Sequence, residues 1–279
     1  MAVDNPRQIA FYGKGGIGKS RLSANLSAWL NASGKRVLHV GCDPKHDSSR
    51  PFLAGRDPVT IVELMRHADG ADPSPEQFLM ETDSGVHCIE VGGPRPGVGC
   101  AGLGILKMFE YLEEGKILQR GYDAVLYDVL GDVVCGGFAA PMRAGYAKEI
   151  CVVVSGEFMA LYAANNICRG VANYASRQEV RLAGVVLNSR NVPRELEVAE
   201  AFAARVGSEV IGVIPRDPLV PEAELKKQTV VELFPDSVPA QAYRTLGETL
   251  LSGTTLAIPQ PVEDRELEEL FFSIVYQEG

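Results

Sequence analysis

Short apolar runs alternate with longer segments of helical periodicity along most of the chain. The apolar runs predict strands at Gln8–Tyr12, Val37–Gly41, Val86–Val91, Ala124–Tyr127, Ile150–Val154, Leu182–Leu187 and Val210–Ile214. The periodic segments predict helices at Ser20–Ala32, Ile61–Met65, Leu103–Glu113, Leu161–Ala175, Glu195–Arg205 and Gln241–Leu250. Because the strands are apolar at nearly every position, they are typical of a parallel sheet buried on both faces. The alternation predicts an α/β fold with a doubly wound, mostly parallel sheet.

The pattern indicates a single domain over residues 1–279. Arg66–Pro75 is rich in Pro, Asp and Gly, but the alternation resumes after it, so we interpret this segment as a surface loop rather than a linker. Residues 260–279 follow Pro259 and contain the acidic helical stretch Glu263–Tyr276. We expect this stretch to form a C-terminal helical arm.

Composition and charge exclude several classes of partner. The chain has 279 residues, of which 46% are hydrophobic, and its 27 basic and 36 acidic side chains give a net charge of −9. An acidic protein is a poor match for nucleic acid or for anionic membranes. The apolar runs are too short to span a bilayer, and the polar start Met1–Arg7 does not resemble a secretory signal. We therefore expect a cytoplasmic protein with reduced cysteines.

The most specific motif is Gly13-Lys-Gly-Gly-Ile-Gly-Lys-Ser20, which fits G-x-x-x-x-G-K-[ST] between a predicted strand and a predicted helix. Backbone N–H groups of such a loop surround phosphate oxygens, and the helix N-terminus adds favourable potential. Lys19 is expected to reach the β- and γ-phosphates, and the Ser20 hydroxyl to ligate Mg²⁺. The loop residues expected at the phosphates are Gly13, Gly15, Gly16, Ile17 and Gly18.

Lys14 adds a second lysine near the start of this loop. The string resembles the deviant Walker A ATPases, a class of P-loop NTPases. This resemblance implies that Lys14 crosses a homodimer interface to the nucleotide of the partner protomer. A solvated lysine is the alternative.

Carboxylates follow two of the predicted strands. Asp128 ends one of them, where it would support Mg²⁺ through water, and Asp128-Val-Leu-Gly-Asp132 has the D-x-x-G form of a segment that senses the γ-phosphate. Asp43, Lys45 and Asp47 follow another strand. We interpret Asp43 and Asp47 as candidates for water activation and Mg²⁺ coupling and Lys45 as a phosphate contact, with an ordinary polar turn as the alternative.

Two of the six cysteines lie in glycine-rich surroundings, Cys100 in Gly97–Gly102 and Cys135 in Asp132–Gly137. Glycine lets backbone N–H groups approach a metal-bound thiolate. Two thiolates are half of the usual shell of an iron–sulfur cluster, so a second copy of the chain would have to supply the rest. Plain buried loop cysteines are the alternative. The others are interpreted as core residues: Cys42, Cys88, Cys151 and Cys168.

Four strings together resemble the nitrogenase iron protein family: Tyr12–Ser20, Gly41–Ser48, Gly92–Gly104 and Tyr127–Pro141. This resemblance implies a homodimer that holds one [4Fe–4S] cluster through Cys100 and Cys135 of each chain and binds one MgATP per chain. It also implies ATP-gated transfer of single electrons from a ferredoxin or flavodoxin to a heteromeric, nitrogenase-like catalytic component.

The same resemblance assigns roles to individual residues. Lys14 and Lys19 would neutralise phosphate charge. Ser20 and Asp47 would hold Mg²⁺. Asp43 and Asp132 would act on the attacking water. Additional residues of the expected nucleotide site are Arg21, Lys45, Asp128, Asn188, Pro215, Arg216, Asp217 and Glu224.

The chain departs from the nitrogenase pattern at three places. Leu103 stands where nitrogenase iron proteins typically carry Arg, Arg95 where Glu is expected, and Arg21 where Thr is usual. These departures favour a partner that does not primarily reduce dinitrogen, with methylthio-alkane reductase as the leading hypothesis. A true nitrogenase or a chlorophyllide-type tetrapyrrole reductase is the alternative partner system.

Two rival classes share the nucleotide loop. Partition-type ATPases need a basic DNA face or a basic amphipathic helix, which the acidic C-terminal stretch lacks. Iron–sulfur scaffolds usually carry a C-x-x-C motif, and this chain has none. The partition-type class also gives no reason for the glycines around Cys100 and Cys135.

Overall fold

The structure is a computed structural model that describes residues 6–67, 72–94, 102–131, 139–143 and 145–276. Its strands are β1 (Arg7–Gly13), β2 (Val37–Gly41), β3 (Met80–Glu81), β4 (His87–Glu90), β5 (Ala124–Asp128), β6 (Glu149–Val154), β7 (Arg181–Asn188) and β8 (Val210–Ile214). Its α-helices are α1 (Lys19–Ala32), α2 (Ile61–His67), α3 (Pro75–Phe78), α4 (Gly102–Glu114), α5 (Ala140–Arg143), α6 (Phe158–Ala175), α7 (Glu195–Arg205), α8 (Leu219–Leu225), α9 (Val230–Leu233), α10 (Val238–Ser252) and α11 (Asp264–Val275).

All the described strands lie in one sheet, in the order β3-β4-β2-β5-β1-β6-β7-β8. Neighbouring strands are parallel except at the β3 edge, where β3 runs antiparallel to β4. The order reverses on either side of β1, so that β5 and β2 lie on one side of it and β6 and β7 on the other. Such a reversal opens a crevice at the carboxyl ends of the strands, which is where doubly wound proteins bind their ligands.

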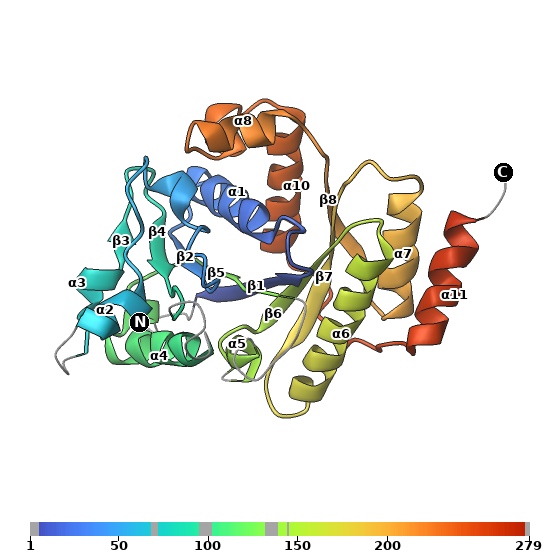
Figure 1. Cartoon of the computed structure of the whole chain (residues 1–279), viewed down its shortest axis with the longest axis horizontal. Helices are drawn as coiled ribbons and strands as arrows, with labels where there is room; N and C mark the ends of the chain where they lie inside the picture. The colour runs from blue at the N-terminus through green and yellow to red at the C-terminus, as the bar shows by residue number, and fades with distance from the viewer. Residues whose placement is uncertain (1–5, 68–71, 95–101, 132–138, 144, 277–279) are drawn as a thin grey trace.

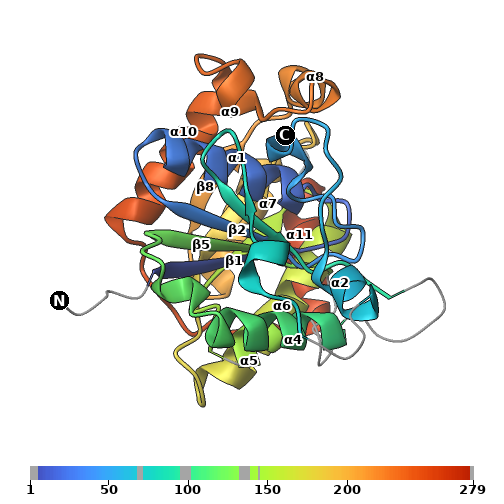
Figure 2. The same cartoon turned by 90° about the vertical axis from the view of Figure 1, so that its left-hand side faces the viewer.

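Helices cover both faces of the sheet (Figures 1 and 2). One face carries α1, α8, α9 and α10, and the other carries α4, α5, α6, α7 and α11. Alternate residues of β1 supply the two cores, since Ile9 and Phe11 are buried with α1 and α10, whereas Ala10 and Tyr12 are buried with α4 and α6. This period of two is what a strand covered on both faces requires. The predicted doubly wound α/β fold is confirmed.

Every predicted strand is present, with bounds that differ by no more than a residue at either end. Five short elements, each seven residues or shorter, were not predicted from the sequence: β3, α3, α5, α8 and α9. Arg66 was expected in a surface loop, and this expectation was wrong, because α2 continues through Arg66 to His67. Both residues are basic side chains in the last turn of that helix, where they interact favourably with the carbonyl end of the helix dipole.

The C-terminal segment packs against the body of the fold. Asn165 on α6 donates to the Val262 carbonyl at 2.8 Å and accepts the Val262 N–H at 3.0 Å, and both residues are buried. Leu267 on α11 is fully buried, and Arg169 pairs with Asp264 at 2.8 Å. The helix expected within residues 260–279 therefore has a buried face toward α6 and α7. No helix of the described residues has the length and apolar character to cross a membrane.

Candidate functional site

The loop between β1 and α1 is held in shape by side chains at the end of β7 and just after it. Gly18, the N-cap of α1, has a φ of 102°, a left-handed value that favours glycine, and a Cβ there would lie 2.4 Å from Asn188 Nδ2. Asn188 donates from Nδ2 to the Ile17 carbonyl at 2.6 Å, and Arg190 donates to the Gly16 carbonyl at 2.6 Å. These two bonds hold the loop to the carboxyl end of β7, and the Ile17 N–H is bonded within the loop to the Lys14 carbonyl at 3.2 Å.

Lys19 lies across the mouth of the loop. Its ammonium donates to the Gly13 carbonyl at 2.7 Å and to the Lys14 carbonyl at 3.2 Å, and the residue is 7% exposed. These two bonds hold the buried ammonium at the start of the loop. The position suits the β- and γ-phosphates of a nucleotide.

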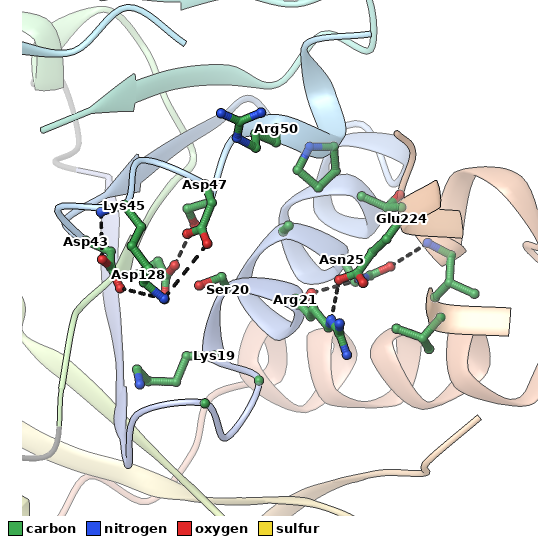
Figure 3. Close-up of a pocket in the computed structure, with 18 of the residues that line it drawn as sticks. Lys19, Ser20, Arg21, Asn25, Asp43, Lys45, Asp47, Arg50, Asp128 and Glu224 are labelled. Atoms are coloured by element: carbon green, nitrogen blue, oxygen red, sulfur yellow. Dashed lines mark hydrogen bonds and ion pairs between the residues drawn. The ribbon is translucent and has the colours of Figure 1, made fainter. Parts of the chain in front are cut away.

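The segment after β2 carries the acidic side of the site (Figure 3). Lys45 Nζ lies 3.4 Å from Asp43 Oδ2 and 3.9 Å from Asp47 Oδ2, and these carboxylates raise the pKa of Lys45 above its usual value. The Lys45 N–H donates to Asp43 Oδ1 at 2.8 Å, which fixes the turn. Asp47 Oδ1 is buried and has no hydrogen-bond partner among the described residues. A buried carboxylate oxygen without a donor is suited to a hydrated cation.

Asp128 ends β5 beside this segment and is 2% exposed. The Ser48 hydroxyl donates to Asp128 Oδ2 at 2.6 Å. Burial raises the pKa of Asp128, and hydrogen bonds from Ser48 and Ser20, with the nearby Lys19 charge, act in the opposite direction. Asp128, Ser20 and Asp47 line the same cavity.

These groups line a cavity of about 830 Å³ at the carboxyl ends of β2 and β5. Its far wall comes from α8, where Glu224 forms an ion pair with Arg21 of α1 (Figure 3). Asn25 accepts the Val230 N–H at 2.8 Å through Oδ1, which joins α1 to the start of α9. Of the predicted nucleotide residues, the following line the cavity: Gly15, Gly16, Gly18, Lys19, Ser20, Arg21, Asp43, Lys45, Asp47, Asp128, Asn188 and Glu224.

Other predicted residues are near the site but do not line the cavity. Ile17 is a buried core residue and Gly13 accepts from Lys19 through its carbonyl. Lys14 is partly exposed on the loop. Pro215, Arg216 and Asp217 follow β8, where Asp217 Oδ1 accepts the Leu219 N–H at 2.8 Å at the start of α8. Cys100, Cys135, Asp132 and Arg95 lie outside the described residues.

The cavity lining also includes residues that the sequence did not single out, and three of them, Ser48, Asn25 and Arg190, make contacts described above. Ser48 closes the string Gly41–Ser48 and was available as a candidate, because a hydroxyl beside a strand-end carboxylate is a common partner. The other two act through long-range contacts that no local spacing reveals.

Four cysteines of the described residues are buried and free, namely Cys42, Cys88, Cys151 and Cys168. Burial raises the pKa of each thiol, so they remain protonated. This confirms their interpretation as core residues. Within the part of the chain that the structure describes, no cluster of three or more His, Cys, Asp or Glu side chains suits a metal ion.

A family model of 4Fe–4S iron–sulfur cluster binding proteins of the NifH/frxC family matches residues 7–277. The chain belongs to this family. A nitrogenase iron protein from Methanospirillum hungatei JF-1 is 50% identical over 266 residues, which cover 95% of this chain and 94% of that protein. NifH-family proteins bind a [4Fe–4S] cluster and MgATP and act as ATP-hydrolysing reductases, so this chain is an iron–sulfur electron-transfer protein of the nitrogenase iron protein type.

Solved structures of other ATPases share the fold. The septum site-determining protein MinD of Pyrococcus horikoshii OT3, complexed with Mg-ADP, has a TM-score of 0.71 at 23% identity over 89% of this chain and 98% of its own. A ParA family ATPase from Chlorobium tepidum TLS has a TM-score of 0.66 at 18% identity over 88% of this chain and 99% of its own. At these identities the likeness extends to the P-loop fold alone.

The described residues fit MgATP on two observations. The glycine-rich loop and the buried Lys19 ammonium line the cavity, and the acidic segment after β2 presents a carboxylate oxygen that has no donor among those residues. A triphosphate suits the first and a hydrated divalent cation the second.

Proposed function

We propose that this chain is the reductase subunit of a nitrogenase-like system whose catalytic component is not a dinitrogen reductase, with methylthio-alkane reductase as the partner system. In this proposal two copies of one P-loop domain form a homodimer. The [4Fe–4S] cluster supplies single-electron transfer when Cys100 and Cys135 of each protomer hold it. A ferredoxin or flavodoxin supplies the electrons.

Most of the contacts to the nucleotide come from one protomer in this proposal. Lys19 and the loop N–H groups bind the phosphates, and Ser20 with Asp47 holds Mg²⁺, with Asp128 hydrogen-bonded behind them. Asp43 and Asp132 orient the attacking water. Lys14 is partly exposed on the loop, and in this proposal its side chain reaches the nucleotide of the partner protomer across the dimer interface. Pro215, Arg216 and Asp217 would frame the base.

The observation that carries the choice of partner is the exposure of Leu103. This residue lies in the first turn of α4, directly after the segment that contains Cys100, and it is 64% exposed. An exposed apolar side chain beside a cluster favours an apolar contact on the docking partner, whereas a nitrogenase-type Arg at this position favours a charged one. Leu103 supports a different partner.

The test begins with anaerobic purification of the wild type and of Cys100→Ser. We expect about four irons per dimer, as one cluster requires, and a reduced-cluster EPR signal that shifts with MgATP, both lost in Cys100→Ser. An iron-free protein whose ATPase activity is indifferent to Cys100→Ser would establish a nucleotide switch instead.

The partner is tested by mixing the protein with a nitrogenase catalytic component. We expect little acetylene or dinitrogen reduction from the wild type and a measurable gain from Leu103→Arg. Reduction by the wild type at normal nitrogenase rates would contradict the proposed partner. The exposed Leu251 on α10 gives a matched control, because Leu251→Arg adds the same charge far from α4.

A further inference from the structure

A chain of buried hydrogen bonds leads away from Asp128 into the core between α1 and β2. Ser48 Oγ lies 2.6 Å from Asp128 Oδ2, His39 Nε2 lies 2.8 Å from Ser48 Oγ, and Ser27 Oγ lies 3.0 Å from His39 Nδ1. Ser27, His39 and Ser48 are each at most 1% exposed. Ser27 is on α1, His39 on β2, and Ser48 on the segment that carries Asp47.

The donor and the acceptor of each of these hydrogen bonds follow from the bond between Ser48 and Asp128. Ser48 has one hydroxyl hydrogen, which it donates to Asp128, so its contact with His39 must be one in which Nε2–H donates to Ser48 Oγ. Burial lowers the pKa of His39 to about 4, so the ring is neutral near pH 7. A neutral ring protonated at Nε2 has an acceptor at Nδ1, which takes the Ser27 hydroxyl hydrogen.

The ring itself is fixed from the side. Phe52 contacts His39 edge-on, with ring centroids 5.5 Å apart, and both rings are buried. Every polar atom of the His39 and Ser48 side chains has a hydrogen-bond partner. A buried hydrogen-bond network that is fully satisfied holds one geometry, which distinguishes this network from a chance contact.

We propose that Ser27, His39 and Ser48 form a positioning relay that holds the Asp128 carboxylate and the Asp47 segment in the geometry for hydrated Mg²⁺. His39 acts through Ser48 and touches neither the nucleotide nor the metal. When the His39 Nε2–H donates to Ser48 Oγ, the Ser48 hydroxyl hydrogen has one orientation, toward Asp128. This inference rests on the Mg²⁺ role proposed for Asp128 and Asp47, and goes beyond it by assigning the residues that orient them.

The first experiment reads the tautomer in protein without nucleotide or metal. The chain has four histidines, so ¹⁵N-histidine labelling gives few signals, and the one absent from His39→Gln belongs to His39. We expect a neutral ring protonated at Nε2. A ring protonated at Nδ1, or at both nitrogens near pH 7, would overturn the relay.

The second experiment compares His39→Leu with His39→Gln. Leucine removes the donor to Ser48, and we expect the Mg²⁺ concentration for half-maximal ATPase activity to rise about 10-fold, as for other outer-shell partners of metal sites. Mn²⁺ binding in the presence of ADP, followed by EPR, should weaken by the same factor. Glutamine carries an N–H donor at a similar reach and should restore most of both.

His87→Leu is the matched control. His87 lies on β4 of the same sheet and forms a 2.7 Å hydrogen bond to Tyr122, away from the cavity. We expect it to leave the Mg²⁺ dependence unchanged. If His39→Leu lowers the Tm but shifts the Mg²⁺ dependence no more than His87→Leu does, the relay is only structural and the inference fails.

Asp128→Asn separates this failure from failure of the proposed function. If Asp128→Asn weakens Mn²⁺ binding and His39→Leu does not, the inference alone is wrong. If neither variant weakens it, the Mg²⁺ role proposed for Asp128 is wrong as well. Neither measurement depends on the iron–sulfur cluster or on a partner protein.

Discussion

The inner strands on the two sides of β1 are all largely buried but are built from different side chains. On one side of β1, the strands β2, β4 and β5 carry the buried polar groups His39, Glu90 and Asp128. On the other side, β6 is buried along its whole length and its only charged residue is Glu149 at the amino end, paired with Arg7. The β6 side has the composition that stability alone favours. On the polar side, burial of ionisable groups costs free energy of folding, and such groups are typical of a functional site.

This difference predicts opposite effects of substitutions in the two halves. Those on the polar side should reduce activity more than stability, and those on the β6 side should reduce stability more than activity. Asp128→Asn should reduce ATPase activity about 100-fold, the upper end for groups that orient a metal. The free energy of unfolding near pH 7 should stay the same or rise, because burial raises the pKa of Asp128 and the amide removes the cost of a buried charge. Steady-state ATPase assays check the expected loss of activity, and urea unfolding of the same preparations checks the expected free energy of unfolding.

A large loss of stability in Asp128→Asn would break the comparison, since it would make Asp128 a structural residue. Ser189→Ala provides the control for a buried polar residue that lies beyond the cavity lining. It should leave the activity nearly unchanged.

Ile150→Ala tests the apolar half. Ile150 is fully buried on β6 between β1 and β7, so truncation should cost about 2–5 kcal/mol of the free energy of unfolding. The Mg²⁺ dependence of the ATPase should not change. Urea unfolding gives the first quantity, and Ile150→Val, expected to cost about 0.5–1.5 kcal/mol, gives the graded control. A shift in Mg²⁺ dependence would show that the halves are coupled.

Glu90 tests the comparison further, through a smaller effect on the free energy of unfolding that depends on pH. Burial raises the pKa of Glu90 to about 8, Ser49 N–H donates to its Oε1 at 2.6 Å, and its Oε2 has no partner among the described residues. In the unfolded chain this carboxyl releases its proton near the ordinary glutamate pKa of 4.5, whereas in the folded protein it keeps the proton. Glu90 therefore stabilises the fold fully below about pH 4.5, and this contribution is lost as the pH rises toward 8.

Glu90→Gln keeps the neutral form at every pH. Its free energy of unfolding should rise relative to the wild type by about 1 kcal/mol per pH unit between pH 5 and pH 8. Urea unfolding across this range checks the slope. A difference that does not vary with pH would mean that Glu90 is ionised in the folded protein. Glu149→Gln is the control, because Glu149 is a buried carboxylate paired with Arg7.

The sheet could be predicted from the sequence because each buried strand is a continuous apolar run. The nucleotide loop could be predicted because its spacing and context are both local. Short elements escaped prediction even where a signal existed, as at α9, where Thr229 and Glu232 form a capping box. The edge strand β3 has two residues, too few for any period.

The site was predictable only as far as its residues are adjacent in sequence. His39 alternates with apolar neighbours in a strand, and nothing local distinguishes it from a buried spacer. Its role depends on Ser27 and Ser48, which approach it only after α1 and the post-β2 segment fold onto the strand. Arg190 is likewise a basic residue after a strand until the fold brings it to Gly16.

The bonds from Asn188 and Arg190 to the nucleotide loop also set an order of events during synthesis. The loop is translated within the first 20 residues, but the side chains that hold its carbonyls come about 170 residues later. A nascent chain that ends before β7 contains the whole Gly13–Ser20 motif without the groups that hold it in shape. We therefore expect such a nascent chain to bind ATP more weakly than the full chain, because the loop lacks the two contacts that hold it.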